Sequence, residues 1–386
     1  MSIEQQLRKF LAPEYVFGPD ARRMVGQYAK NLGAHKVFVV SDPGVVAAGW
    51  TADVTASLDD VLLPWTLFTA VSSNPRAEEV MAGAAAYAAE QCNLIVAVGG
   101  GSPIDCAKGV GIVSSNGGHI LDYEGIDRVP LPMPPLICIP TTGGTSADVS
   151  QFAIFSNPQK KNKIAIVSKS VVPDLALIDP QPLTTMDAYL SACTGLDALT
   201  HAIEAFVSNA HSPMTDLHAL ESVRLLSRYL LLSLQAPDDV GLRSQVMMGS
   251  LQAGLAFSNA ILGANHALAN SLGGFLDLAH GECNATLIDH VIAFNYDSTP
   301  ERFDAISMAM GLNLNGLSSR ERKEKLLQHV RFMKNQAGIA NVLSTLGVSS
   351  ADVAGLALNA HHDPCLLTNP RSANVRDLEV LYEESL

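Results

Sequence analysis

The segment from Leu94 to Pro103 places the tightest constraint on the fold of this chain. Leu94-Ile95-Val96-Ala97-Val98 is a short apolar run rich in β-branched residues, and it leads directly into Gly99-Gly100-Gly101-Ser102-Pro103. Such a run predicts a buried strand, and Pro103 fits the first turn of a helix, where its missing N–H costs nothing. The three glycines allow positive φ angles and a close approach of a ligand to the main chain. The segment therefore predicts a strand, a tight turn and a helix.

The turn in this unit is also a candidate site for an anion. Unpaired N–H groups at the start of a helix and the helix dipole both favour a phosphate or pyrophosphate. The pattern differs from the Gly-x-Gly-x-x-Gly fingerprint and from a Walker loop, because no Gly-Lys-Ser/Thr follows the turn. A strand-to-helix connection without any ligand is the alternative interpretation.

Two further strand ends indicate the same kind of ligand. The apolar run Lys36–Val40 ends in Ser41-Asp42-Pro43-Gly44, and the Asp42 carboxylate can accept hydrogen bonds from a ribose diol. It would also repel a 2′-phosphate, which favours NAD over NADP, although an Asp in such a turn is often only a turn former. The run Leu136–Ile139 leads into a loop of hydroxyls and glycines, Pro140 to Asp148, which suits ribose or nicotinamide groups.

The order of these patterns predicts two domains. Short β-branched runs at 36–40, 94–98, 136–139 and 175–178 alternate with alanine-rich, helix-like stretches, which predicts a mostly parallel sheet with helices on both faces. After Asp179-Pro180-Gln181-Pro182, segments with a 3.6-residue period take over, for instance 217–234 and 245–257. We therefore expect an NAD-binding α/β domain over residues 1–182 and an all-helical, metal-binding helix-bundle domain over residues 183–386.

The helical half contains a candidate metal site. Asp197 and His201 are four residues apart, so a helix places both on one face, and His266 and His280 follow in glycine-rich surroundings. One carboxylate and three imidazoles suit Fe(II), Zn(II) or another first-row ion better than Ca or Mg, and the absence of cysteine disfavours a closed structural zinc site. For the Asp197 and His201 pair alone, an ordinary helix charge and a core histidine are the alternative.

Several motifs together resemble the iron-dependent (group III) alcohol dehydrogenases along essentially the whole chain. They are the glycine-serine turn with Asp105 and Lys108, Pro140-Thr141-Thr142-Gly143-Gly144-Thr145, Gly195 to Glu204, Phe257-Ser258-Asn259-Ala260 with Gly263 and His266, His280-Gly281, and Asn369-Pro370-Arg371. The resemblance implies that NAD(P) and a divalent metal, most commonly iron, meet in the cleft between the two domains.

The resemblance also implies roles for individual residues. Asp197, His201, His266 and His280 fall on metal-ligand positions. The positions that line the nucleotide are Asp42, Asn74, Gly99, Gly100, Gly101, Ser102, Thr141, Thr142, Thr145, Lys163 and Leu183. Phe152, Phe257 and Cys365 would lie near the substrate.

The chain departs from the family pattern at three positions. The second histidine of the usual His-x-x-x-His, a proton-relay residue, is Asn270, and an amide cannot exchange protons near neutral pH. A shorter carboxylate, Asp148, stands in a loop on the cofactor side where the family has Glu, and Asp289 replaces a usual Pro. We therefore expect Asn270 to lie at the catalytic site without transferring the proton itself. The proton would leave by a water chain or through the ribose hydroxyls.

Charge and cysteine content restrict the partners and the compartment. The 38 acidic and 25 basic residues give a net charge of −13, which disfavours nucleic acid and anionic membranes as partners. The six cysteines form no Cys-x-x-Cys pair and are expected to be reduced and mostly buried. Residues 1–6 have neither a basic n-region nor an apolar h-region, and no apolar run approaches 20 residues, so we expect a cytoplasmic protein.

The function expected from the motifs and the resemblance is hydride transfer between NAD and a small alcohol or aldehyde with one divalent metal per chain. The resemblance also implies a homo-oligomer. Two alternatives remain open at this point. A cofactor- and metal-binding sensor or regulatory paralogue could retain the metal quartet without turnover. A cyclising lyase of the dehydroquinate-synthase type is the least favoured, because the sequence lacks a dense basic cluster for a phosphorylated acid substrate.

Overall fold

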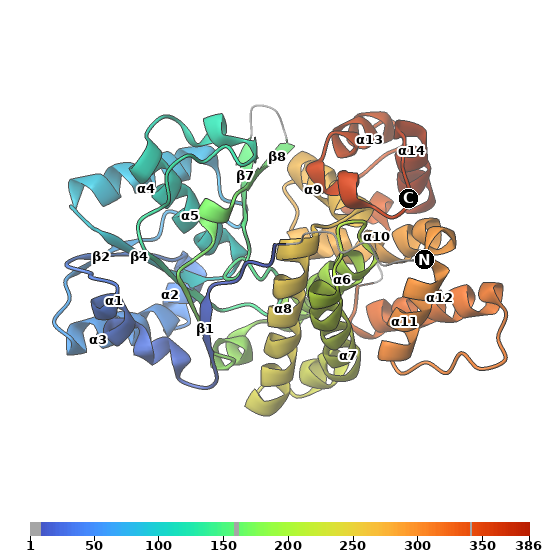
Figure 1. Cartoon of the computed structure of the whole chain (residues 1–386), viewed down its shortest axis with the longest axis horizontal. Coiled ribbons are helices and arrows are strands. Elements are labelled where there is room, and N and C mark those ends of the chain that lie inside the picture. The colour runs from blue at the N-terminus through green and yellow to red at the C-terminus, as the bar shows by residue number, and fades with distance from the viewer. Residues whose placement is uncertain (1–8, 158–161, 340–341) are drawn as a thin grey trace.

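The computed structural model describes residues 9–157, 162–339 and 342–386. Residues 1–8, on which the expectation about a leader segment falls, lie outside the described residues. Figure 1 shows the two halves of the chain side by side, with the N-terminal half in blue to green and the helical half in yellow to red.

A six-stranded sheet forms the centre of the N-terminal half. Every pairing in it is parallel, and the strand order is β1-β9-β6-β4-β2-β3. The bounds are β1 (Glu14–Phe17), β2 (Val37–Val40), β3 (Trp65–Phe68), β4 (Leu94–Gly99), β6 (Leu136–Pro140) and β9 (Leu175–Ile178). The parallel sheet and its four predicted strands are confirmed, whereas β1 and β3 at the two edges were not predicted.

Helices cover both faces of this sheet, as expected from the fully apolar strands. On β2 and β4 successive side chains point to opposite faces. Phe38, Val40, Ile95 and Ala97 pack with α4 (Ala77–Ala89) and α5 (Gly101–Asn116), whereas Val37, Val39, Leu94 and Val96 pack with α1 (Val25–Asn31) and α3 (Trp50–Asp60). The short helix α2 (Pro43–Ala47) follows β2 directly.

A second, mixed sheet of three strands was not anticipated. It has the order β5-β8-β7, with β7 (Phe152–Asn157) antiparallel to β8 (Asn162–Val167) and β5 (Gly125–Ile126) parallel to β8. Its buried residues Ala153, Phe155, Ile164 and Ile166 join the same core cluster as α4 and α5. The sheet therefore adds a layer beyond these helices and carries Phe152 and Lys163 toward the helical half.

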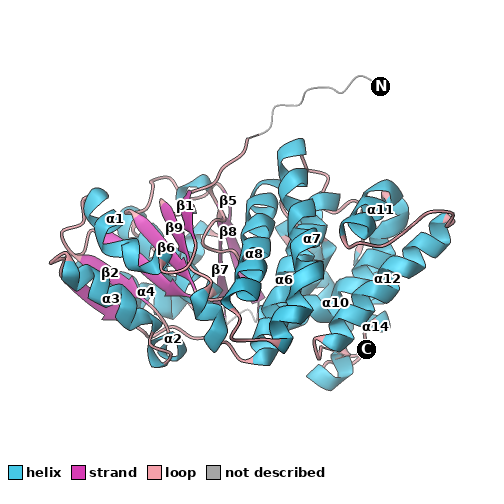
Figure 2. Ribbon diagram, turned by 90° about the horizontal axis from the view of Figure 1, so that it is seen from below, coloured by secondary structure: helices cyan, strands magenta, loops and turns pink. Residues whose placement is uncertain are grey.

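Helices make up the C-terminal half, in agreement with the predicted all-helical architecture. The long helices α6, α7 and α8 lie side by side (Figure 2), and they share one core cluster with parts of α10, α11 and α12. A second cluster joins α9, α10, α13 and α14. The bounds are α6 (Ala188–Val207), α7 (Pro213–Gln235), α8 (Val240–Ala260), α9 (Ala264–Leu276), α10 (His280–Asn295), α11 (Pro300–Ala309), α12 (Ser319–Gln336), α13 (Val353–His361) and α14 (Val375–Glu384).

Asp289, one of the departures from the family pattern, is a buried ion-pair partner that joins two helices. It lies on α10, and its carboxylate accepts hydrogen bonds from Lys334 Nζ at 2.6 Å and Arg331 Nε at 2.7 Å, both on α12. These bonds lower the pKa of Asp289 although burial raises it. The carboxylate thus acts in helix packing, far along α10 from His280.

All six cysteines are free and buried, and their burial agrees with the expectation from sequence. Among the described residues, no single helix is long and apolar enough to cross a membrane; α8 and α9 pass the length and composition test only as a pair bent by 100°.

Candidate active site

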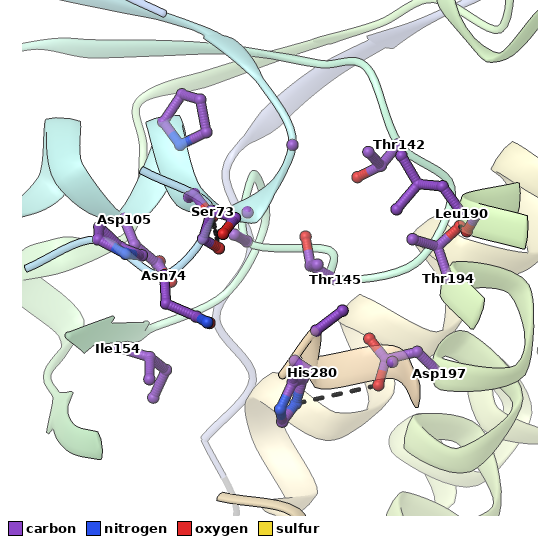
Figure 3. A pocket seen from close by; sticks show the side chains of 18 of the residues that line it. Ser73, Asn74, Asp105, Thr142, Thr145, Ile154, Leu190, Thr194, Asp197 and His280 are labelled. Carbon is purple, nitrogen blue, oxygen red and sulfur yellow. Dashed lines mark hydrogen bonds and ion pairs between the residues drawn. The ribbon is translucent and has the colours of Figure 1, made fainter. Parts of the chain in front are cut away.

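A cleft of about 650 Å³ opens between the two halves of the chain. Figure 3 shows Asn74 and Asp105 on one side of it and Asp197 and His280 on the other. Its lining includes most of the residues expected from sequence: Asp42, Asn74, Gly100, Gly101, Ser102, Thr141, Thr142, Thr145, Phe152, Lys163, Asp197, His201, Phe257, His266, Asn270, His280 and Cys365. Gly99 and Leu183 do not line the cleft, because Gly99 ends β4 beneath Pro103 and Leu183 packs against Gly143.

The glycine turn after β4 forms one wall of the cleft. Only the first of its three glycines, Gly99, has a positive φ, at +154°. At Gly100 and Gly101 the constraint is space, since a Cβ atom would come within 2.9 Å of Thr142 and 3.0 Å of Thr145. The turn therefore packs tightly against the loop after β6, and α5 begins at Gly101 with its first N–H groups at this wall.

Asp42 combines both roles that the sequence left open. Its Oδ1 accepts hydrogen bonds from the N–H groups of Gly44 at 2.8 Å and Val45 at 3.0 Å, so it caps α2. The same residue lines the cleft beside the glycine turn. Helix capping uses one carboxylate oxygen and leaves the negative charge of Asp42 at the cleft.

Asn74 and Lys163 form a polar pair in the cleft that also contacts the helical half. Lys163 Nζ donates to Asn74 Oδ1 at 2.8 Å, and Asn74 Nδ2 donates to Asp277 Oδ1 at 2.8 Å, in the loop between α9 and α10. Burial lowers the pKa of Lys163. The two residues predicted to bind the nucleotide are thus linked to the loop that precedes His280.

Three helices bring the four candidate metal ligands together. Asp197 and His201 lie one turn apart on α6, His266 is in the first turn of α9, and His280 begins α10. One potential ligand atom from each residue lies within 4.8 Å of the others. The sequence prediction that these four residues form one cluster agrees with this geometry.

The chemistry of this cluster fits a metal ion. Asp197 Oδ2 and His201 Nδ1 are buried and have no hydrogen-bond partner among the described residues, which is costly unless another group satisfies them. Burial lowers the pKa of His201 to about 3 and also lowers the pKa of His280. Both imidazoles are therefore neutral at physiological pH, and neutral imidazole is the form that binds a metal.

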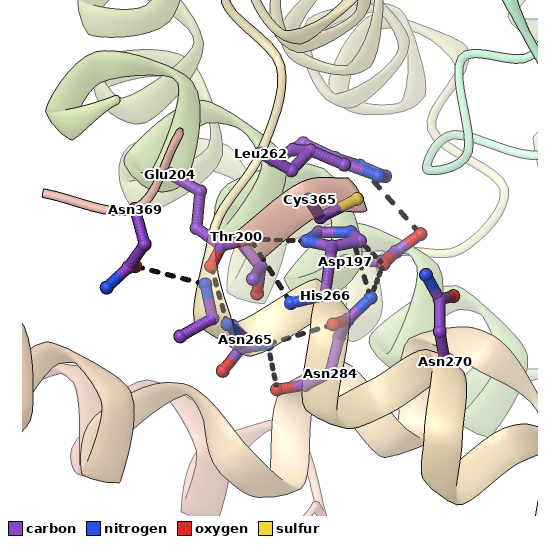
Figure 4. A network of polar contacts seen from close by, with 12 residues as sticks. Asp197, Thr200, Glu204, Leu262, Asn265, His266, Asn270, Asn284, Cys365 and Asn369 are labelled. Carbon is purple, nitrogen blue, oxygen red and sulfur yellow. Dashed lines mark hydrogen bonds and ion pairs between the residues drawn. The ribbon is translucent and has the colours of Figure 1, made fainter. Parts of the chain in front are cut away.

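Two residues without an assignment from sequence contact these candidate ligands. Glu204 Oε2 contacts His266 Nδ1 at 2.5 Å, and Glu204 Oε1 accepts from the N–H of Asn265 at 2.7 Å at the start of α9. Asn284 Nδ2 donates to Asp197 Oδ1 at 2.7 Å and lies 3.1 Å from His266 Nε2 (Figure 4). It lies at the same distance, 3.1 Å, from His280 Nε2. The Nε2 atoms of both histidines consequently face the same point.

Helical spacing is the signal that would have found both residues. Glu204 is seven residues after Asp197 on α6, and Asn284 is four residues after His280 on α10, so each lies on the same helix face as a ligand. Gly281 allows the two helices to approach, because a Cβ there would come within 2.6 Å of the Cys193 carbonyl oxygen on α6.

Aromatic side chains enclose the metal end of the cleft. The Phe257 ring stacks on His201 at a centroid distance of 4.4 Å, and Phe152 lies 5.8 Å from Phe257. Cys365 is buried, and burial raises the pKa of its thiol well above the usual range. Phe152, Phe257 and Cys365, which were expected near the substrate, thus all line the cleft.

Two family models cover nearly the whole chain: the iron-containing alcohol dehydrogenase model over residues 12–180 and the Fe-containing alcohol dehydrogenase C-terminal model over residues 191–386. The chain belongs to the iron-containing alcohol dehydrogenase family. It is 36% identical to the 1,3-propanediol dehydrogenase of Klebsiella pneumoniae over 371 residues, which are 96% of each chain. It is 33% identical to the NAD-dependent methanol dehydrogenase of Bacillus methanolicus over 377 residues, 98% of this chain and 99% of that one. A crystal structure of a 1,3-propanediol oxidoreductase matches 99% of this chain and 100% of its own, with a TM-score of 0.96 and 35% identity.

Asp148, one of the departures from the family pattern, lies behind the cofactor-side loop and does not line the cleft. It is buried, and burial raises its pKa to about 6, while the charge of Lys108 on α5 lowers it. Burial in turn lowers the pKa of Lys108, whose Nζ donates to the carbonyl oxygens of Ser150 and Phe152. Asp148 therefore belongs to a buried network beneath the loop.

The raised pKa predicts that Asp148→Asn stabilises the protein above about pH 6. Below about pH 3 the carboxyl is protonated in both the folded and the unfolded chain. As the pH rises toward 6, only the unfolded chain readily loses this proton, so the free energy of unfolding of the parent protein falls relative to Asp148→Asn. The difference should level off above pH 6 at about 3 kcal/mol. Urea unfolding of both proteins between pH 4.5 and 7.5 measures it, and a pH-independent difference would contradict the prediction.

Proposed function

We infer that this protein is a metal-dependent, NAD-linked alcohol dehydrogenase that transfers a hydride between the nicotinamide and a small alcohol or aldehyde. One observation carries this inference: a cluster of one carboxylate and three imidazoles lies in the same cleft as the glycine turn of the α/β half. Iron is the metal we propose, with zinc or another first-row ion as a substitute, because this ligand set accepts several such ions.

The residues of the chain divide the work between the two sides of the cleft. Asp197, His201, His266 and His280 would hold the metal, with Glu204 and Asn284 orienting them. A bound metal ion supplies Lewis acidity toward the substrate oxygen, and NAD supplies the redox chemistry. Phe152 and Phe257 would provide the apolar surface beside the substrate. Because the Asn270 amide cannot exchange a proton, a water chain or the ribose hydroxyls would carry the proton away.

For the nucleotide we propose the predicted residues that line the cleft, with Asp42 disfavouring a 2′-phosphate and Lys163 beside Asn74 facing the ribose. Gly99 and Leu183 would act by shaping the turn and the neighbouring loop. We propose a domain boundary between residues 182 and 183, within the short 3₁₀ helix Gln181–Thr185.

The substrate class follows from the relatives and the lining of the cleft. The two relatives are named for 1,3-propanediol and methanol, and the cleft lining includes the apolar side chains Phe152, Phe257 and Leu262. We therefore propose short-chain alcohols and their aldehydes as substrates. We further propose a cytoplasmic homo-oligomer without nucleic-acid or membrane partners, in line with the free cysteines and the net charge of −13.

The deciding experiment combines purified protein, reconstituted with Fe(II), with NAD and a panel of short alcohols. We expect metal-dependent formation of NADH, measured by its absorbance, and loss of that signal after chelation. Tight binding of NADH without turnover on any alcohol or aldehyde of the panel would contradict the dehydrogenase function.

Cofactor preference gives a second test. Asp42→Asn retains an oxygen that can accept the N–H bonds of Gly44 and Val45, so α2 stays capped while the negative charge is removed. The ratio of kcat/KM for NADP to that for NAD should rise roughly tenfold, which corresponds to about 1.4 kcal/mol. Asp60→Asn, at an exposed position on α3, is the matched control. An unchanged ratio would mean that Asp42 only caps the helix.

A further inference from the structure

Asn270 lies beside the metal cluster, and the NH₂ group of its side-chain amide is hydrogen-bonded to a carboxylate. It follows His266 by one turn of α9, and Figure 4 shows both side chains on the same side of that helix. Its Nδ2 donates to Asp363 Oδ2 at 2.9 Å. The Asn270 side chain is almost fully buried and lines the cleft.

Asp363 is itself held in place by the turn that follows it. Its Oδ1 accepts a hydrogen bond from the N–H of Cys365 at 2.8 Å and caps the short helix Pro364–Thr368. Both carboxylate oxygens therefore accept hydrogen bonds, one from the main chain and one from Asn270. Because an ionised carboxylate is an acceptor only, it binds the NH₂ end of the amide and not its oxygen.

The orientation of the amide has a consequence for the cleft. The carbonyl oxygen of Asn270 accepts no hydrogen bond from any described residue, so it is available to a ligand. Around the metal cluster the neighbouring lining is apolar, with Phe152, Phe257 and Leu262. A polar group of a substrate next to Asn270 thus meets a hydrogen-bond acceptor in a low-polarity environment.

We propose that Asp363 is a positioning residue that fixes the Asn270 amide so that its carbonyl oxygen accepts a hydrogen bond from a second donor group of the substrate. This inference rests on the proposed function and narrows its substrate class. Favoured substrates carry a hydroxyl or amino group besides the reacting hydroxyl. A histidine in the family pattern at this position can also donate, whereas the fixed amide of this chain only accepts.

The test compares 1,3-propanediol with 1-butanol, which has a methyl group in place of the second hydroxyl, and with 3-methoxy-1-propanol, which has an oxygen but no donor. The wild-type holoenzyme should favour the diol in kcat/KM over both. Asp363→Asn offers the amide of Asn270 either a donor or an acceptor, so its orientation is no longer fixed. The diol preference should then fall roughly five- to tenfold, mainly through a higher KM for the diol, with little change for 1-butanol.

Asn270→Leu should lose the same preference, and the double variant should lose no more than either single one, because both changes remove one interaction. Asp352→Asn is the control, since the Asp352 carboxylate also accepts a backbone N–H but bonds Ser349, which does not line the cleft. Equal losses on all three alcohols in Asp363→Asn, or additive losses in the double variant, would overturn the positioning role. A wild-type holoenzyme that oxidises none of the alcohols would instead overturn the proposed function, and this inference with it.

Discussion

His266→Ala should leave the purified protein with well under one metal ion per chain and reduce alcohol oxidation by roughly a thousandfold or more. The reason is that His266 is the one candidate ligand on α9, and its imidazole is held in place by Glu204 at 2.5 Å. Loss of metal removes several kcal/mol of transition-state stabilisation. Mass spectrometry or atomic absorption measures the metal content, and the NADH assay measures the rate.

NADH binding and the fold should survive this change, because the predicted nucleotide residues lie on the other wall of the cleft. Glu204→Gln provides a graded comparison, since it retains the shape of Glu204 but not its charge; we expect a 10- to 100-fold loss in metal affinity. The exposed His35 supplies the control His35→Ala. Full metal occupancy in His266→Ala would exclude His266 from the ligand set.

Asn270→His should raise the rate of alcohol oxidation near neutral pH by about a hundredfold, if proton removal limits the reaction. The introduced imidazole would lie beside the Asp363 carboxylate, which now accepts from Asn270 at 2.9 Å and would orient an N–H of the ring. Oxidation releases a proton, so the neutral imidazole is the active form. The rate should therefore increase with pH through about 6 to 7, the histidine range.

The pH profile distinguishes this outcome from a packing effect. Turnover of the wild type and of Asn270→His is measured across pH 5 to 9 with the same alcohol. Asn270→Gln serves as the control, because it retains an amide and adds no titrating group. An unchanged rate and profile in Asn270→His would mean that the proton leaves by a route that does not involve position 270.

Much of the α/β half was predictable because its signals are local. Residues 94–98 are apolar on both faces, which is the pattern of a strand covered on both sides, and Pro103 marks the start of a helix; β4 and α5 confirm both points. The edge strands β1 and β3 escaped because their side chains are partly exposed, and the mixed sheet was missed although β7 and β8 are as long as β4. Their pairing depends on distant strands, as in Glu14 opposite Leu175.

The candidate site also has features that the sequence predicts and contacts that only the structure reveals. The residue types of the metal quartet, their spacing on one helix and the glycine turn could be read from the sequence alone. The residues that contact the candidate ligands could not be read from the sequence, because those contacts join segments far apart. Glu204 and His266 are separated by 62 positions, and Asn270 and Asp363 by 93. Periodicity indicates which face of a helix is buried, but not which side chain meets it there.

The sequence by itself determined the order of the two halves, the family to which the chain belongs and the chemistry available to it, one carboxylate and three imidazoles beside a nucleotide-type turn. Only the tertiary structure decided how that chemistry is arranged. The packing of α6, α9 and α10 brings the four candidate ligands together, the Asp148 carboxylate is buried away from the cleft, and the Asn270 amide donates to Asp363. The physical reason is that local spacing specifies which groups a helix presents, whereas burial and hydrogen bonding between distant segments set their charge state and direction.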